Sequence, residues 1–384
     1  MTRSHLERLC GLVILSLVLA ACDGGGRIPT AGPPDEAPLT TRRSSTSSSP
    51  QVTPNAATST PTGGSSGSAD AARFCAVGLP ASWKAAKTAE NENVVAMSTT
   101  GSVRWAAPEL SWVAPGSRTH IATVPAPGLG SAWLVGHHVA YQRLRSDENW
   151  GDWELYLWDS TKRGRPVKLD DSDGQIRNAP FLLVAASDDA LVWLHPLEDG
   201  RREVRLHQVA TGRTTIVHVG HVGTPLVAGD LLLWPEAFAI DASPRLVAVD
   251  LRTLKSVRLP GPLAELRDPQ EMSSDGRTFA WASADRRRLM VWQRGWPAAR
   301  VVTETEEGNQ ITWPKVSGDT VSWVADRTYT ADLRSGSFTP MTKQWGAAES
   351  WGDRFLHIGV PAGAGDSFHL DTSTLPPLPS CERS

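Results

Sequence analysis

Residues that could bind a metal ion occur at three places in the sequence, and none of them has the spacing of a protein metal site. His218 and His221 lie three positions apart, and on an extended strand such residues point to opposite faces, so they would not share an ion. The pair 137–138 has no acidic residue close by in the sequence. The segment 170–174 is acidic like the start of a calcium loop, but the downstream glutamate is missing. We therefore expect no metal and no cofactor.

Motifs of catalytic nucleophiles and phosphate sites are also missing beyond residue 73. That part of the chain has neither a Gly-x-Ser-x-Gly nucleophile turn nor a Gly-Lys-Ser/Thr phosphate loop. No catalytic residue can therefore be named from the sequence. A role without catalysis is favoured, and a catalytic site that only the tertiary structure assembles stays open as an alternative.

Two short polar segments are candidates for binding a ligand or a partner. Trp150 and Trp153 flank Asp152 and follow two further acidic residues, a combination that suits stacking against a sugar ring or a cationic side chain. The alternative is that both indoles fold back over the edge of a sheet. The second segment could pair with an acidic partner or form a solvated hairpin tip, and it consists of Arg286, Arg287 and Arg288.

The overall composition excludes several classes of protein. The 384 residues are 40% hydrophobic and 21% charged, with a formal net charge of −3. This balance rules out a polytopic membrane protein and a wholly disordered chain, and it lacks the excess of Lys and Arg that nucleic-acid binding needs. Tryptophan dominates the aromatic content, with 16 Trp against 7 Phe and 3 Tyr. The positions of the tryptophans are therefore the best guide to the fold.

The first 21 residues have the pattern of a secretory signal peptide. Arg3 and Arg8 precede an apolar run from Leu12 to Leu19, which is too short to span a bilayer as an ordinary helix. The run ends in Leu-Ala-Ala-Cys, which resembles the lipobox of bacterial lipoproteins. The resemblance implies that Cys22 carries the lipid and that the protein is extracytoplasmic, anchored to the outer face of the cell membrane. The alternative is an ordinary cleaved signal in which Cys22 has no such role.

Residues 22–73 are expected to form a disordered tether. They are almost all Gly, Ser, Thr, Pro and Ala, and they hold too few large aliphatic side chains to form a core. A flexible chain of this length has a root-mean-square reach of roughly 40 Å. We expect the tether to lift a folded domain, residues 74–384, away from the membrane surface.

Two cysteines remain once Cys10 has left with the signal peptide and Cys22 has been lipidated: Cys75 and Cys381. In an oxidising compartment, two such thiols are best explained as a disulfide. One lies near the start of the folded region and the other near its end, so the bond would bring the two ends of the domain together. Two free thiols are the alternative.

A short apolar strand with an aromatic residue at its third position recurs along the folded region. The third positions lie 34 to 52 residues apart, 42 on average, and are Trp105, Tyr141, Trp193, Trp234, Trp281, Trp323 and, in a degraded copy, His357. Turn-forming Gly and Asp residues precede most copies, and an alternating second strand follows most of them. The sequence predicts an all-β chain forming a single β-propeller with seven four-stranded blades, six or eight being the alternatives. We expect the blades near 91–127, 128–174, 175–221, 222–262, 263–306, 307–343 and 344–379.

One copy of the repeat resembles the repeat of TolB-type β-propellers. It begins at Pro269, passes through a serine-containing strand and the Asp275-Gly276 turn, and continues into the apolar strand that contains Trp281. The other copies keep only parts of this pattern. The resemblance implies a propeller that works through protein partners.

Together, these features favour a lipid-anchored, non-catalytic protein-binding module or scaffold of the cell envelope, with another envelope protein as its partner. Two alternatives stay open. One is a hydrolase or lyase with a site in the central funnel that acts on an extracellular polymer or peptide. The other is a carbohydrate-binding propeller. In either binding role, we expect the Trp150 segment and the arginine segment to lie in rim loops between the second and third strands of their blades.

Overall fold

The computed structural model describes residues 74–88, 94–125, 128–146, 149–172, 182–237, 243–266, 269–343, 345–359 and 367–381. The predicted signal peptide, the lipidation site Cys22 and the predicted tether lie outside these described residues. Within them, no helix is both long enough and apolar enough to cross a membrane.

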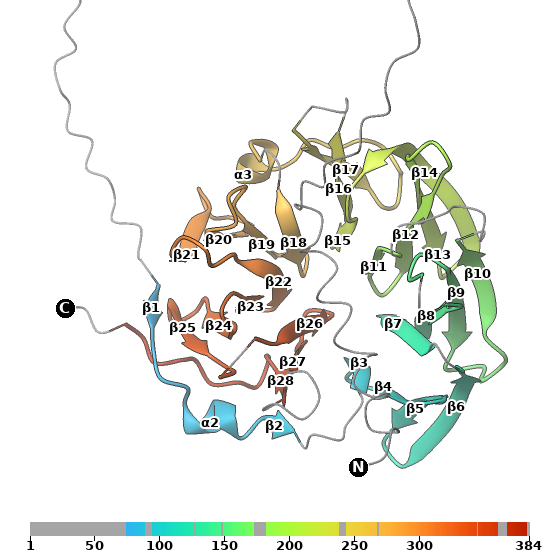
Figure 1. Cartoon of the computed structure of the whole chain (residues 1–384), viewed down its shortest axis with the longest axis horizontal. Helices are drawn as coiled ribbons and strands as arrows, with labels where there is room; N and C mark the ends of the chain where they lie inside the picture. Colours follow the sequence, from blue (N-terminus) through green and yellow to red (C-terminus); the bar gives the residue numbers. More distant parts are fainter. Residues whose placement is uncertain are drawn as a thin grey trace, which may run out of the picture.

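The described chain is an all-β propeller in which antiparallel sheets stand around a common centre (Figure 1). In each sheet the chain runs outwards strand by strand, because alternating apolar residues and tight turns favour hairpins between neighbours. The first two sheets consist of β3 (Val94–Ser98), β4 (Gly101–Ala106), β5 (Glu109–Ala114) and β6 (Ser117–Thr123), and of β7 (Gly128–Val135), β8 (His138–Leu144), β9 (Trp153–Asp159) and β10 (Val167–Asp171).

The third sheet is larger, because two groups of strands share it. The groups are β11 (Val184–Ala186), β12 (Ala190–Pro196), β13 (Arg202–Gln208) and β14 (Arg213–Val222), and β15 (Leu226–Ala228), β16 (Leu231–Ala237) and β17 (Arg245–Asp250). They are joined by a short pairing of β14 with β16, at His221 with Ala237 and Val222 with Glu236. The number of blades depends on whether this sheet counts as one or two, so seven blades stays a prediction.

Three more sheets complete the ring. They are β18 (Gln270–Ser274), β19 (Thr278–Ala282), β20 (Arg288–Gln293) and β21 (Arg300–Glu304); β22 (Thr312–Ser317), β23 (Thr320–Val324), β24 (Thr328–Asp332) and β25 (Ser337–Pro340); and β26 (Ala347–Trp351), β27 (Phe355–Gly359) and β28 (Ser367–Asp371). The innermost strands of successive sheets contact one another, and β26 contacts β3, which closes the ring. Two short helices are α2 (Ala81–Lys84) and α3 (Gly261–Ala264).

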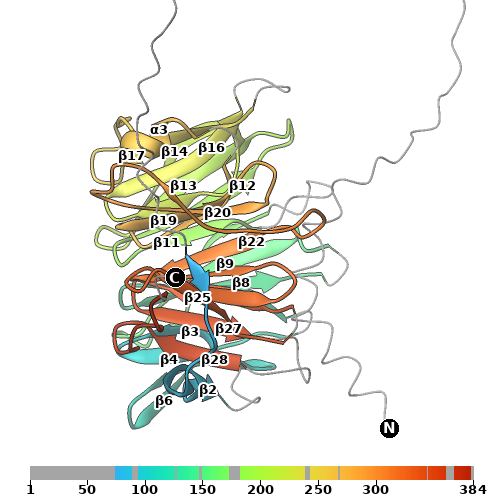
Figure 2. The same ribbon diagram turned by 90° about the vertical axis from the view of Figure 1, so that its left-hand side faces the viewer.

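Residues from the start of the folded region complete the last sheet of the propeller. Strand β2 (Lys87–Thr88) pairs with β28 and becomes the outermost strand of the last sheet, while β1 (Cys75–Ala76) pairs in parallel with β25. In Figure 2, which views the propeller from its side, β1 is the blue strand next to β25. The expectation that residues 344–379 supply the whole last blade is therefore wrong, because its outer strand comes from the N-terminal side.

The predicted disulfide between Cys75 and Cys381 is present, with 5.8 Å between the two Cα atoms and 306 residues between the partners. Both cysteines contact the turn before β25, since the backbone nitrogen of Cys75 and the disulfide sulfur of Cys381 each lie 3.3 Å from the carbonyl oxygen of Gly336. The bond thus fixes β1 and the C-terminal segment to one place on the β22–β25 sheet.

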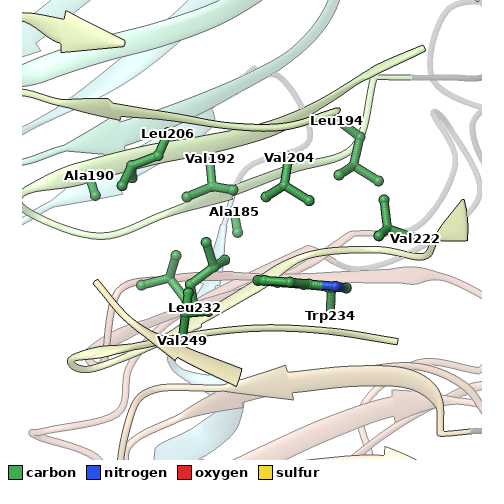
Figure 3. Close-up of a cluster of buried hydrophobic side chains, with 11 residues drawn as sticks. Ala185, Ala190, Val192, Leu194, Val204, Leu206, Val222, Leu232, Trp234 and Val249 are labelled. Carbon is green, nitrogen blue, oxygen red and sulfur yellow. The ribbon is translucent and has the colours of Figure 1, made fainter. Parts of the chain in front are cut away.

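Clusters of buried hydrophobic side chains hold neighbouring sheets together, and most of the repeated tryptophans belong to them. Figure 3 shows one cluster, in which Val192 and Leu206 of one strand group face Leu232, Trp234 and Val249 of the next. Burying one such side chain contributes about 1.5–3 kcal/mol. Of the tryptophans at the third position of the repeat, those that are fully or almost fully buried are Trp193, Trp234, Trp281 and Trp323. Trp158 of β9 and Trp292 of β20 are buried as well.

The junction between the last and the first sheet differs from the others. Among the described residues, no buried hydrophobic cluster consists mainly of side chains from the β26–β28 sheet and the β3–β6 sheet. Instead, Trp351 of β26 reaches the cluster of the first two sheets and stacks on the ring of His357, with 5.5 Å between ring centroids. His369 of β28 lies next to both rings. The degraded seventh copy of the repeat thus has His357, packed against His369, at the position where the other copies have Trp or Tyr.

Candidate functional site

A pocket of about 320 Å³ opens between the β18–β21 sheet and the β22–β25 sheet. It lies at the end of the propeller where the loops between second and third strands meet the loops between sheets, and we call it the rim pocket. One wall is the end of β21 and the loop after it, and the other is the end of β23 with parts of β24 and β25. Its lining residues are Thr303, Glu304, Thr305, Glu306, Asn309, Trp323, Ala325, Asp326, Tyr329 and Phe338.

Three aromatic rings form the apolar side of the rim pocket. Trp323 and Tyr329 are directly opposite each other on β23 and β24, and their rings stack with centroids 5.4 Å apart and planes 12° apart. Phe338 of β25 meets both rings edge-on, at 5.7 and 6.3 Å. Trp323, the third residue of its repeat copy, is 1% exposed, whereas Tyr329 and Phe338 are partly exposed. The repeat pattern therefore places the ring that anchors this group.

Three carboxylates form the polar side, and they belong to Glu304, Glu306 and Asp326. Asp326 Oδ1 accepts a hydrogen bond of 2.8 Å from the hydroxyl of Tyr329, and its Oδ2 accepts one of 2.8 Å from Arg327 Nε. Burial opposes ionisation of Asp326, but these two hydrogen bonds outweigh it and lower the pKa of the carboxyl. Asp326 therefore carries a negative charge at neutral pH.

The hydrogen bond between Tyr329 and Asp326 raises the pKa of the Tyr329 hydroxyl. Burial, together with the hydrogen bond to the Asp326 carboxylate, raises the pKa of Tyr329 to about 12. The hydroxyl stays protonated and directs its hydrogen at Asp326. The ten lining residues include no Lys, Arg or His, so the rim pocket combines negative charge with aromatic surface.

The predicted arginine segment lies behind the loop that forms one wall of the rim pocket. The carbonyl oxygen of Arg287 accepts a 2.8 Å hydrogen bond from the backbone N–H of Thr305, and that of Arg286 accepts one of 2.7 Å from Ile311. Nε of Arg287 also donates to the carbonyl oxygen of Thr305, at 3.3 Å. Backbone groups of the arginine hairpin thus hold the 305–311 loop in place.

The arginine side chains are not presented together as a cationic cluster. Arg286 Nη2 is 3.6 Å from Glu271 Oε1, and Arg287 Nη2 is 4.0 Å from Glu304 Oε1. Arg288 is exposed at the start of β20. The segment therefore lies on the rim as expected, but its first two members pair with acidic residues of this chain.

The inner strands of the two sheets that form the rim pocket, β18 and β22, each contain an irregularity in their strand pairing. Glu271 of β18 and Trp313 of β22 both have a positive φ, 50° and 48°, which is uncommon for residues other than glycine. The carboxylate of Glu271 accepts a hydrogen bond from the backbone N–H of Trp313. This contact, together with the Arg286 ion pair, ties the inner strands of the two sheets that form the rim pocket, and it stabilises both unusual conformations.

The predicted two-tryptophan platform does not exist. Trp153 begins β9, is 0% exposed and packs in a buried cluster with Leu155 and Trp193. Trp150 is partly buried against the same cluster, and Asp152 accepts a 2.6 Å hydrogen bond from Arg145. The prediction that Trp153 binds a ligand on the rim is therefore wrong, because the strand begins at Trp153 and turns its side chain into the core.

His218 and His221 have different surroundings. His218 Nε2 is 2.7 Å from Glu236 Oε1, and the imidazole stacks on Trp234. His221 is exposed and lies at the β14–β16 pairing. Asp170, from the acidic segment, contacts Trp193, His195 and Arg205. Within the part of the chain that the structure describes, no three His, Cys, Asp or Glu residues are grouped to hold a metal ion.

Sequence reasoning missed the acidic residues of the rim pocket. A usable signal was present: residues 304–307 include three glutamates at the predicted boundary between two blades, and an Asp follows Trp323 by three positions. Neither feature by itself indicates a site, because residues 304–306 and Asp326 come together only when the two sheets pack side by side.

Comparisons with known proteins found similar solved structures but no related sequence. No protein-family model and no curated protein matches the sequence. A prolyl endopeptidase structure is 14% identical over 76% of this chain and 49% of its own, with a TM-score of 0.46. TolB from Acinetobacter baumannii is 17% identical over 62% of this chain and 64% of its own, with a TM-score of 0.40.

A third similar structure, Hsv2 from Kluyveromyces lactis, is 13% identical over 70% of this chain and 90% of its own, with a TM-score of 0.46. This chain spans about half the length of the prolyl endopeptidase and just under two thirds of TolB. The fold of the chain is that of a β-propeller.

Proposed function

We propose that the chain is a membrane-anchored, extracytoplasmic β-propeller that binds another protein of the cell envelope without catalysing a reaction. The observation that carries this proposal is the rim pocket, a hollow with an aromatic side and a carboxylate side. Interfaces concentrate their binding energy in pockets that accept one or two anchoring side chains, and aromatic residues are enriched there.

The position of the rim pocket supports docking by a macromolecule. It opens on the loops of the rim, where a partner can approach without entering the ring. Its walls are held by backbone hydrogen bonds from Thr305 and Ile311 to the arginine hairpin. A preformed surface loses little conformational entropy on binding, and this favours affinity.

The lining lacks the partners that would activate its Thr hydroxyls as nucleophiles. The ten residues include two Thr hydroxyls, but no His or Lys that could activate them, and no Ser or Cys. The Oγ1 of Thr305 is already 2.5 Å from the carbonyl oxygen of Asn309. An enzyme that works through an activated Thr nucleophile would need a different site, and the glycan alternative loses the support of the Trp150–Trp153 platform.

The anchoring part of the proposal rests on the N-terminal sequence. Cys22 follows a lipobox-like segment, and the residues after it have the composition of a flexible tether. Attachment of more than one acyl chain at Cys22 would hold the propeller stably at the membrane. The partner is then expected in the same envelope compartment.

Site-specific photo-crosslinking in intact cells tests the binding function. A photoreactive residue replaces Asn309, which is exposed on the rim pocket, and a control probe replaces Thr211, which is exposed in the turn after β13 at the opposite end of the sheets. We expect a discrete protein adduct from position 309 and none from position 211. No adduct at position 309, or the same adduct at both positions, would contradict the proposal.

A further inference from the structure

We infer that the rim pocket receives a cationic side chain, a lysine or an arginine, of the protein that docks on the rim. This inference rests on the proposed function and adds the chemical class of the anchoring group. It depends on three properties of the pocket, which are its charge, its aromatic surface and its size.

The charge of the pocket favours a cation and opposes an anion. Glu304, Glu306 and Asp326 bring three carboxylates to a lining that has no basic residue. Glu306 is exposed, and its carboxylate forms no ion pair with any residue that the structure describes. It is therefore available to an incoming ammonium or guanidinium group.

Two guanidinium groups pair with Glu304 and Asp326, at positions exposed to solvent, and neither pairs with Glu306. Arg287 Nη2 is 4.0 Å from Glu304 Oε1, with the side chains 43% and 59% exposed, and ion pairs of that kind contribute little. Arg327 contacts Asp326 from outside the lining, through Oδ2. A ligand cation would compete only with solvated pairs.

The aromatic side supplies the second half of the recognition. A cation within about 6 Å of an aromatic face gains roughly 0.5–1 kcal/mol when exposed and about 2 kcal/mol when desolvated. Tyr329 and Phe338 are both partly exposed, and both belong to the lining. The rings would contact the methylene stem of a lysine or arginine, while the carboxylates contact its charged end.

The size of the rim pocket and its hydrogen-bonding groups further limit the kind of ligand that it can accept. A volume of about 320 Å³ lies at the lower end of small-molecule sites, which suits one long side chain better than a large cofactor. The hydroxyl hydrogen of Tyr329 is directed at Asp326, so the phenol offers no donor to a neutral ligand. The three carboxylates of the lining are acceptors only, and the charged end of a lysine or arginine would supply donors to them.

Binding of small probe cations to the mature full-length protein in detergent provides the first test. The chain has only three tyrosines, Tyr141, Tyr156 and Tyr329, so labelling with 3-fluorotyrosine yields three ¹⁹F NMR signals. The first two stack on each other in the β7–β10 sheet and serve as internal controls. The probes are the amides of Nα-acetyl-lysine, Nα-acetyl-arginine and, as a neutral analogue, Nα-acetyl-norleucine.

We expect either cationic probe, or both, to shift the Tyr329 signal in a saturable and salt-dependent way, while norleucine amide does not. Glu306→Gln should weaken the binding about two- to fivefold, the range for one exposed ion pair. Glu307→Gln, in the same loop but outside the lining, is the matched control and should have no effect. Equal shifts with norleucine amide, or no shift with either cation, would overturn the inference.

The crosslinking experiment separates this inference from the proposed function. The probe at position 309 is combined with Glu306→Gln and Asp326→Asn, and circular dichroism and thermal melting establish that the variant folds. A partner adduct that persists at full intensity would overturn the cationic anchor and leave the binding function standing. Absence of any adduct in the chain that carries the probe at position 309 and no other change would contradict the binding function itself, whatever the small cations do. Loss of the adduct in the double variant alone is the expected result.

Discussion

The imidazole ring of His357 lies 4.7 Å from that of His369, centroid to centroid, on the side of the last sheet that faces β3. Trp351 covers the pair, and Glu349 is opposite His357 on the neighbouring strand. Burial, and to a smaller extent the neighbouring His369, lowers the pKa of His357 to about 3. The junction that closes the ring therefore depends on a histidine that must stay neutral.

This arrangement predicts a loss of stability in mild acid. The folded-state pKa of His357 is below its unfolded value, so the unfolded chain binds an additional proton as the pH falls below about 6.5. The free energy of unfolding should fall by roughly 2–3 kcal/mol between pH 7.5 and 4.5 from this group alone. Urea unfolding at a series of pH values measures it.

Replacement of the histidine isolates its contribution. His357→Gln should flatten the pH dependence, while His221→Gln, at an exposed position, should leave it as steep as before. The stability of both variants should still depend on pH to some extent, because burial also lowers the pKa values of His138 and His207. A profile equally steep in His357→Gln and in the unmodified chain would refute the role of the junction.

The disulfide should stabilise the whole propeller. It joins Cys75 and Cys381 across 306 residues, and loss of a native disulfide typically costs about 2–5 kcal/mol. The double variant Cys75→Ser/Cys381→Ser should unfold at a lower urea concentration than the unmodified chain. Adding a reductant to the unmodified chain should reproduce that shift, and adding it to the double variant should change nothing.

Trp153 should act through stability and not through ligand binding. Its side chain is fully buried, and truncation of a buried tryptophan to alanine costs about 3–5 kcal/mol. Trp153→Ala should therefore lower the urea midpoint strongly, and Trp153→Phe should lower it less. A Trp153→Ala protein of unchanged stability would show that the indole is not part of the core.

Cys22 should decide where the protein resides. If Cys22 carries the lipid, Cys22→Ser should move the protein from the membrane fraction to the soluble fraction and abolish incorporation of labelled palmitate. Cell fractionation followed by immunoblotting measures the change. The Cys75→Ser/Cys381→Ser variant is the control and should remain in the membrane fraction, since those cysteines form the disulfide. A Cys22→Ser protein that stays membrane-bound would exclude anchoring through this residue.

Much of the propeller could be read from the sequence, because its signals are local. Strand alternation follows from the way side chains alternate between the two faces of a sheet, and Trp193, Trp234 and Trp323 at the recurring third position are buried as that pattern requires. The pairing of the two cysteines followed from counting. These features need no knowledge of how distant segments meet.

Three features were decided only by the tertiary structure. Strand β2 has two residues, too few to show periodicity, so only its pairing with β28 reveals that it completes the last sheet. The inward orientation of Trp153 depends on where β9 begins, because side chains alternate between faces and one step reverses them. The rim pocket unites Glu304 and Glu306 with Asp326 and Tyr329 from the next sheet, since packing between sheets, and not any local pattern, sets the distance between them.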